Sequence, residues 1–298
     1  MSINIIFPAY PGDNKKIDPF WEKEAEAAKA VGFGISLLAG SHFGPGLSIH
    51  SFNDHDRALY RGWIIKKNTY EEMTTLEPNL LNSYNDYLWS LDFPKWYNDF
   101  PSGETPNSFY YISDEIISLG LPEIAEQVAD KVGHKSLMIK DWLKSRKHEW
   151  FDACFIRDAA DIEESLRIMN NFFKLQGRDF YGGLVFRDFL SLKMAGIHPK
   201  SNMPVPVEFR TFFLNKKPFF TCPYWTNDIT YPENIETPSQ EWLGMIGSHI
   251  KSPFVALDIA QEETGKWTAI ECNDGGSSGL PDHVDMKGFY QILFNGLK

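Results

Sequence analysis

The residues of this chain that could do chemistry gather in its last fifth, in the run FVALDIAQEETGKWTAIECNDGG. The run has the pattern of two β-strands joined by a polar turn at residues 261–266. Asp258 lies on the first expected strand, and Glu271 and Asn273 lie on the second. Because side chains two residues apart share a face of a strand, Glu271 and Asn273 point the same way, and an antiparallel return brings Asp258 opposite Glu271.

These three side chains offer the oxygen ligands that Mg²⁺ prefers, since this ion takes carboxylates together with substrate phosphates and water. One acid in a strand is better explained as a solvated strand end. Three such groups in register within an apolar hairpin favour a metal. The sequence therefore predicts that Asp258, Glu271 and Asn273 hold Mg²⁺.

Three cations lie inside strand-like apolar segments. Lys140 is in SLMIKDWLKS, Arg187 is in GGLVFRDFL, and Arg210 is in VEFRTFF. A buried charge must be paired or must bind something, so a structural ion pair explains each arginine singly, and a strand-edge lysine can reach solvent. Taken with the metal cluster, the three cations are better explained as ligands of a nucleotide triphosphate.

A basic segment, KSRKHEW at residues 144–150, stands out in a chain that is acidic overall. As a loop over a cleft it would attract and cover a polyphosphate, and a solvated hairpin tip explains it equally well. The usual phosphate and nucleophile motifs are missing: there is no GxxxxGK[ST] loop, no GxGxxG after a strand and no GxSxG. Nucleophilic catalysis by a Ser/His/Asp triad therefore has no support.

The elements that must position these residues change character along the chain. Residues 1–130 alternate strand and helix, which predicts an α/β domain with a parallel sheet. We expect strands at 4–7, 34–39 and 58–65 and helices at 19–31 and 70–76. Residues 131–298 predict an α+β domain in which antiparallel strands dominate, with strands at 135–144 and 151–157 and one long helix between Asp158 and Gly177.

Composition limits the function further. A net charge of −11 argues against broad affinity for nucleic acid, which needs a basic surface. No apolar run is long enough to span a membrane, and the first residues predict a β-strand instead of a signal peptide, so we expect a cytoplasmic protein. The three cysteines are expected to be buried thiols: Cys154, Cys222 and Cys272.

Four segments together resemble the ATP-grasp superfamily, and within it the clade marked by two strand arginines and a lysine. They follow the family's order over residues 134–285: MIKDWLKSRKHEW, GGLVFRDFL, VEFRTFFLNKKPF and VALDIA…WTAIECNDGGSSGLP. The resemblance implies an α/β pre-ATP-grasp domain at 1–130 and an α+β ATP-grasp domain at 131–298. In the latter, a lid subdomain (about 134–185) and a C-terminal sheet subdomain (about 186–298), both with antiparallel sheets, would clamp the nucleotide.

The resemblance also implies roles for individual residues. Lys140 would contact ATP phosphate from the lid, and Arg187 and Arg210 would be the catalytic groups that flank the phosphates or an acyl-phosphate intermediate. Many members have glycines in the lid loop, and this chain has none there, so a loop cation would take over, with Lys144, Arg146 and Lys147 as the candidates. The adenine would be bordered by Asp188, Phe189 and Leu190. The Mg²⁺ ligands would be Asp258, Glu271 and Asn273.

Such enzymes use ATP and Mg²⁺ to phosphorylate a carboxylate, and an amine or similar nucleophile such as a thiol then displaces phosphate. The implied function is an ATP-dependent ligase of small-molecule or peptide substrates, with the acceptor in the cleft against the N-terminal domain near Arg61 and Trp63. A phosphotransferase on the same scaffold and a non-catalytic ATP-binding protein are the alternatives.

Overall fold

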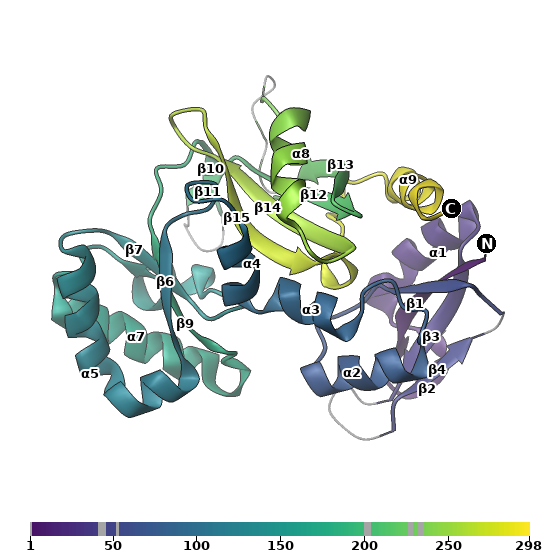
Figure 1. The fold of residues 1–298 in the computed structure, drawn as a ribbon, viewed down its shortest axis with the longest axis horizontal. Coiled ribbons are helices and arrows are strands. Elements are labelled where there is room, and N and C mark those ends of the chain that lie inside the picture. The colour runs from purple at the N-terminus through teal and green to yellow at the C-terminus, as the bar shows by residue number, and fades with distance from the viewer. Residues whose placement is uncertain are drawn as a thin grey trace.

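The computed structural model describes residues 2–40, 46–51, 54–199, 204–225, 229, 231 and 235–298. Figure 1 shows the N-terminal domain at one end, a second sheet with its helices at the other, and a third sheet between and above them. The chain passes between the two ends through three helices: α2 (Lys67–Leu76), α3 (Tyr84–Leu91) and α4 (Phe93–Asp99).

The N-terminal domain is built on a five-stranded mixed sheet. Its strands are β1 (Ile3–Tyr10), β2 (Asp13–Ile17), β3 (Gly34–Ala39), β4 (Ser48–Ser51) and β5 (Arg57–Tyr60). The strand β1 runs parallel to β3 and β5, which confirms the expected parallel pairing, while β2 and β4 add antiparallel edges. The third expected strand ends at Tyr60, because the chain turns there toward the C-terminal part, where the amide of Gly62 donates to the carbonyl of Gly276.

Two helices that are far apart in the sequence cover the N-terminal sheet together. They are α1 (Glu22–Val31) and α9 (Met286–Leu297), and they lie side by side in Figure 1. Ala25 and Ala28 of α1 share one buried core with Phe289 and Leu293 of α9. The last helix of the chain therefore packs on the first domain.

The second sheet, which we call the lid sheet, is antiparallel throughout, in the order β6-β9-β7-β8. Its strands are β6 (Ser108–Ile112), β7 (Leu137–Lys140), β8 (Phe155–Ile156) and β9 (Gly183–Asp188). The covering helices α5 (Ser113–Val132) and α7 (Ile162–Gln176) pack their apolar faces into its core. The domain boundary at residue 130 stays a prediction, but β6 joins residues before that point to the lid sheet.

The expected strand over residues 151–157 is shorter than predicted. A helical turn, α6 (Trp150–Ala153), precedes the two-residue strand β8. The chain also forms short 3-10 turns at Pro19–Trp21, Lys147–Glu149, Gly177–Asp179 and Gly275–Ser277. The turn at Lys147–Glu149 places the basic segment beside the end of β7.

The third sheet, which we call the C-terminal sheet, is also antiparallel, in the order β13-β12-β14-β15. Its strands are β12 (Glu208–Leu214), β13 (Lys217–Pro223), β14 (Phe254–Gln261) and β15 (Trp267–Asp274). Helix α8 (Gln240–His249) packs on this sheet through Leu243 and Ile246, and a separate two-stranded ribbon precedes it, β10 (Met194–Ile197) and β11 (Pro204–Pro206). The dominance of antiparallel pairing after residue 131 is confirmed.

All three cysteines are buried free thiols, as expected. Within the described residues, no helix combines the length and apolar character needed to cross a membrane.

Candidate functional site

A row of three charged side chains crosses the C-terminal sheet. Asp258 on β14 is paired in register with Arg210 on β12 and with Glu271 on β15. Asn273 is opposite Ala256, two residues along each strand, so it lies on the same face as the row. The predicted register of Asp258 with Glu271 is therefore confirmed, and the four polar residues face one side of the sheet.

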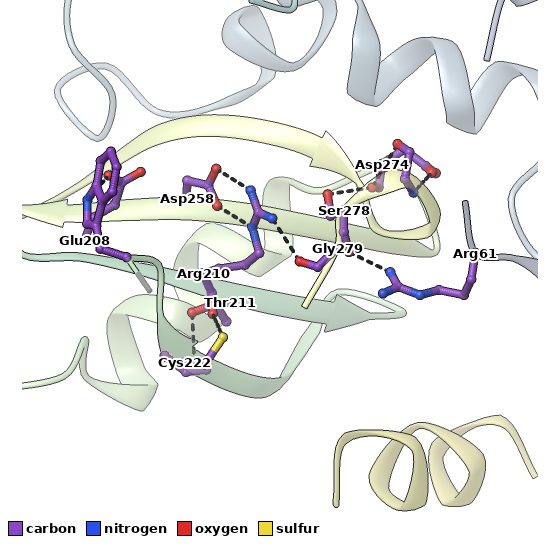
Figure 2. Close-up of polar contacts among 12 residues, drawn as sticks. Arg61, Glu208, Arg210, Thr211, Cys222, Asp258, Asp274, Ser278 and Gly279 are labelled. Atoms are coloured by element: carbon purple, nitrogen blue, oxygen red, sulfur yellow. Dashed lines mark hydrogen bonds and ion pairs between the residues drawn. The ribbon is translucent and has the colours of Figure 1, made fainter. Parts of the chain in front are cut away.

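The Arg210 guanidinium holds the Asp258 carboxylate through two hydrogen bonds of 2.8 and 2.9 Å. Figure 2 shows Arg210 reaching between Asp258 and the backbone carbonyl of Gly279, to which it donates a third bond of 3.1 Å. Asp258 is only 1% exposed, and a charge at that depth needs a partner. Arg210 supplies it.

Glu271 is neutralised from the other sheet. Lys140, at the end of β7, is 2% exposed and donates from its ammonium to Glu271, whose side chain is 27% exposed. Burial favours the neutral acid, but the charges of Lys140 and Lys147 outweigh it, so the pKa of Glu271 lies below its usual value. This ion pair joins the lid sheet to the C-terminal sheet.

Arg187 reaches the same place from β9. Strand β15 carries an extra residue, Ile270, between the partners of Asp258 and Ile259, and this bulge frees the Ile270 carbonyl to accept from Nη1 of Arg187. Nε of Arg187 donates to Ser108 at 3.3 Å. Nη2 is buried and has no hydrogen-bond partner among the described residues. Burial lowers the pKa of Arg187 to about 10, so a nearby anion would stabilise its charge.

A cavity of about 360 Å³ opens between the lid sheet and the C-terminal sheet. Six of the predicted site residues line it: Lys140, Arg187, Asp188, Phe189, Leu190 and Glu271. The side chains of the other four are outside its lining: Lys144, Arg210, Asp258 and Asn273. Arg210 still borders the cavity through Tyr224, a lining residue whose ring lies 4.8 Å from its guanidinium carbon.

The prediction for Lys144 is not supported, because its side chain is exposed and does not reach the cavity. The carboxylate of Asp141 accepts from the amides of Leu143 and Lys144 and folds the chain into a tight turn there. Lys147, three residues further, lines the cavity in its place. Its ammonium lies 4.8 Å from the Trp225 ring centroid and 5.1 Å from that of Tyr224.

The sequence did not single out several lining residues: Met138, Ser145, Trp150, Met194, Pro206, Glu208, Tyr224 and Trp225. A period of two would have found Met138 and Glu208, because they share strand faces with Lys140 and Arg210. Glu208 is buried, and burial together with the nearby Asp258 charge raises its pKa to about 8.

The donor set suits Mg²⁺ in its chemistry. Asp258 and Glu271 offer carboxylates and Asn273 offers an amide oxygen, all hard ligands on one strand face. No group of three or more His, Cys, Asp or Glu side chains that could hold a metal occurs in the described part of the chain, so this set depends on the amide as its third ligand. Each of its two carboxylates is ion-paired here with a cation, Arg210 or Lys140.

Arg61 does not line an acceptor cleft, which corrects the expectation from sequence. It is fully buried and forms an ion pair with Glu24, and its Nη1 donates to the carbonyls of Gly275 and Ser278 at 2.6 and 2.7 Å. Figure 2 shows it holding the turn that continues to Gly279 and Arg210. Arg61 therefore connects the N-terminal domain to the site as a structural residue, and Trp63 stays partly exposed at 38%.

Solved structures similar to this chain are ATP-grasp proteins. A RimK domain ATP-grasp protein from Sphaerobacter thermophilus is 12% identical over 99% of each chain, with a TM-score of 0.60. The ATP-grasp ligase PsnB, complexed with a minimal precursor, is 12% identical over 100% of each chain, with a TM-score of 0.57. D-cycloserine synthetase DcsG is 12% identical over 99% of this chain and 100% of its own, with a TM-score of 0.57.

At these identities the likeness establishes the fold, which is that of ATP-grasp proteins along the whole chain. No curated protein matches the sequence. The family described as the ATP-grasp domain of the clade with two arginines and a lysine, family 3, matches residues 130–293. Because this match covers more than half of the chain, the protein belongs to this clade of the ATP-grasp family.

Proposed function

We propose that this protein is an ATP- and Mg²⁺-dependent ligase that activates a carboxylate as an acyl phosphate and joins it to an amine or a similar nucleophile. The carrying observation is the cavity between the two sheets, where the buried cations Lys140 and Arg187 meet the carboxylate of Glu271. Nη2 of Arg187, buried and without a partner among the described residues, supports a site for an anion. ATP is the anion that the family uses.

The cavity lining divides into two chemical parts, which supports one orientation of the nucleotide. Trp150 and Phe189, whose ring centroids are 6.0 Å apart, provide an apolar wall for the base, and the chain segment 188–190 borders it. Lys140 and Arg187 provide the positive wall for the phosphates. The order of these parts assigns Asp188, Phe189 and Leu190 to the base.

Two steps complete the proposed reaction. In the first, a carboxylate oxygen of the substrate bonds to the γ-phosphorus of ATP, and the bond from that phosphorus to the β–γ bridging oxygen breaks, which releases ADP. In the second, the nucleophile adds to the acyl carbon, phosphate leaves with the electron pair of the C–O bond, and the proton of the nucleophile passes to solvent. Both steps need groups held in line and negative charge neutralised.

The protein's own residues serve these needs through preset charge. Lys140 and Arg187 stabilise the phosphoryl oxygens, and their burial strengthens that effect relative to water. Arg210 acts on the acyl phosphate from the adjoining edge, with Asp258 fixing its guanidinium plane. Asp258, Glu271 and Asn273 would hold Mg²⁺, which when bound neutralises charge on the β- and γ-phosphates.

The substrates belong to the same proposal. One similar structure holds a precursor peptide and another is a D-cycloserine synthetase, so peptide and small-molecule carboxylates are both candidates. The acceptor would approach from the N-terminal domain side, beside the turn at residues 275–279.

The test is Glu271→Gln, which removes one carboxylate charge without changing the shape of the side chain. We expect ATP turnover to fall by about 100-fold or more, the range for loss of one preorganised electrostatic group. The matched control is Glu126→Gln, at an exposed position on α5, which should keep full turnover. Wild-type turnover in Glu271→Gln would refute the site assignment.

A screen for phosphate release over paired amino acids and peptides then identifies the reaction. A ligase needs both substrates and yields ADP, free phosphate and a joined product that mass spectrometry detects. A phosphotransferase yields ADP and a phosphorylated substrate without free phosphate. The second pattern would overturn the ligase proposal.

A further inference from the structure

The basic loop at residues 144–149 offers the phosphates a side chain and not a backbone cradle. Phosphate loops commonly use free backbone amides that point at the anion. Here the carboxylate of Asp141 already accepts from the amides of Leu143 and Lys144 at 2.7 and 2.6 Å. The amide of Glu149 donates to the carbonyl of Arg146. These three amides are therefore bonded within the chain.

Lys147 is the cation of this loop that lies inside the cavity. Lys144 is exposed, and Arg146 donates to Glu149 at 2.8 Å outside the cavity lining. Lys147 shares the lining with Lys140 and Arg187, the two groups proposed to bind phosphate.

The rings of Tyr224 and Trp225 hold the Lys147 ammonium in position. Their centroids lie 5.1 and 4.8 Å from Nζ, which is within the range of a cation–π contact. Two acids, Glu208 and Glu271, line the same cavity. The rings and acids together keep this positive charge on the far wall of the cavity from β7, where a polyphosphate between the sheets could meet it.

We infer that Lys147 is the phosphate ligand of the lid loop, acting in place of backbone amides, with Tyr224 and Trp225 positioning its ammonium. This inference rests on the proposed ATP-dependent function. On nucleotide binding the ammonium exchanges its ring contacts for phosphate oxygens, and the short turn at Lys147–Glu149 moves with it.

The test compares Lys147→Met with Lys144→Met by titration calorimetry, using ATP and AMP in the presence of Mg²⁺. For Lys147→Met we expect ATP affinity to fall roughly 10- to 100-fold, the effect of losing one charge-assisted hydrogen bond, and AMP affinity to change less than about twofold. Lys144→Met should bind both nucleotides like the wild type. Lys147→Arg, which keeps the charge, should recover most of the ATP affinity.

Each remaining outcome decides the matter. Wild-type ATP affinity in Lys147→Met would overturn the inference, as would equal losses for ATP and AMP, because that pattern marks a general change in the cavity. Wild-type protein that binds neither nucleotide would overturn the proposed function and this inference with it. Intact AMP binding in Lys147→Met serves as the check that the variant is folded.

Discussion

Replacing Lys140 with methionine should affect metal binding and nucleotide binding in opposite directions. In the nucleotide-free structure the Lys140 ammonium neutralises Glu271, a proposed metal ligand. A divalent cation must therefore displace that ammonium or bind against its charge. When ATP enters, the same ammonium can move to phosphate and leave Glu271 to the metal. Lys140→Met removes the competitor for the metal and the ligand for the phosphate.

The size of the effect follows from the depth of the pair. Breaking a buried ion pair costs about 3–5 kcal/mol. Glu271 is 27% exposed, so solvent screens part of this interaction, and about 1.5–2 kcal/mol is the appropriate range. That range corresponds to roughly 10- to 30-fold tighter binding of a divalent cation to the nucleotide-free variant. Loss of one charge-assisted hydrogen bond weakens ATP binding by roughly 10- to 100-fold.

Electron paramagnetic resonance of Mn²⁺ measures the first change, because free and bound ion give distinct signals, and calorimetry with ATP measures the second. Lys144→Met, at an exposed position of the same segment, is the matched control and should leave both affinities unchanged. If Lys140→Met bound Mn²⁺ no better than the wild type, the ion pair would not control access to Glu271, and the reasoning would be wrong.

Two further predictions concern stability. Arg61→Met leaves Glu24 and two backbone carbonyls buried without their partner and should lower the free energy of unfolding by about 3–5 kcal/mol, measured by urea denaturation, while the exposed control Arg178→Met should change it by less than about 0.5 kcal/mol. Burial raises the pKa of Glu208 from its ordinary 4.5 to about 8, so the folded state keeps a proton that the unfolded state releases. Its contribution therefore falls as pH rises from 4.5 to 8, and Glu208→Gln should flatten this part of the stability profile; a steeper profile in the variant would contradict the assignment.

The sequence predicted the elements whose signals are local. The hairpin of β14 and β15 follows from alternating residues and a polar turn, and its register brought Asp258 opposite Glu271 as expected. Strand β6 escaped prediction, because its partner β9 lies about seventy residues further along the chain and the pairing has no local signal. The bulge at Ile270, which frees the carbonyl that Arg187 uses, was likewise not visible in the residue pattern.

Arg61 shows why a charged residue in an apolar strand is ambiguous in sequence. Its surroundings resemble those of Arg187, and both side chains are buried. The difference lies in their partners: Arg61 has a carboxylate from Glu24 and two carbonyls, while Nη2 of Arg187 has no partner among the described residues. Satisfaction of the side chain, which depends on contacts hundreds of residues apart, separates a structural arginine from a ligand-binding one.

The same requirement governs the whole site. The sequence suggested phosphate-binding cations and metal-binding acids as two separate sets, but buried charges without partners are too costly to persist in a folded protein. The structure meets that requirement by pairing one set with the other, Lys140 with Glu271 and Arg210 with Asp258. A nucleotide with its metal ion carries both kinds of charge and can take over both kinds of pairing. Nucleotide and metal should therefore bind together, each favouring the other through the partners it releases.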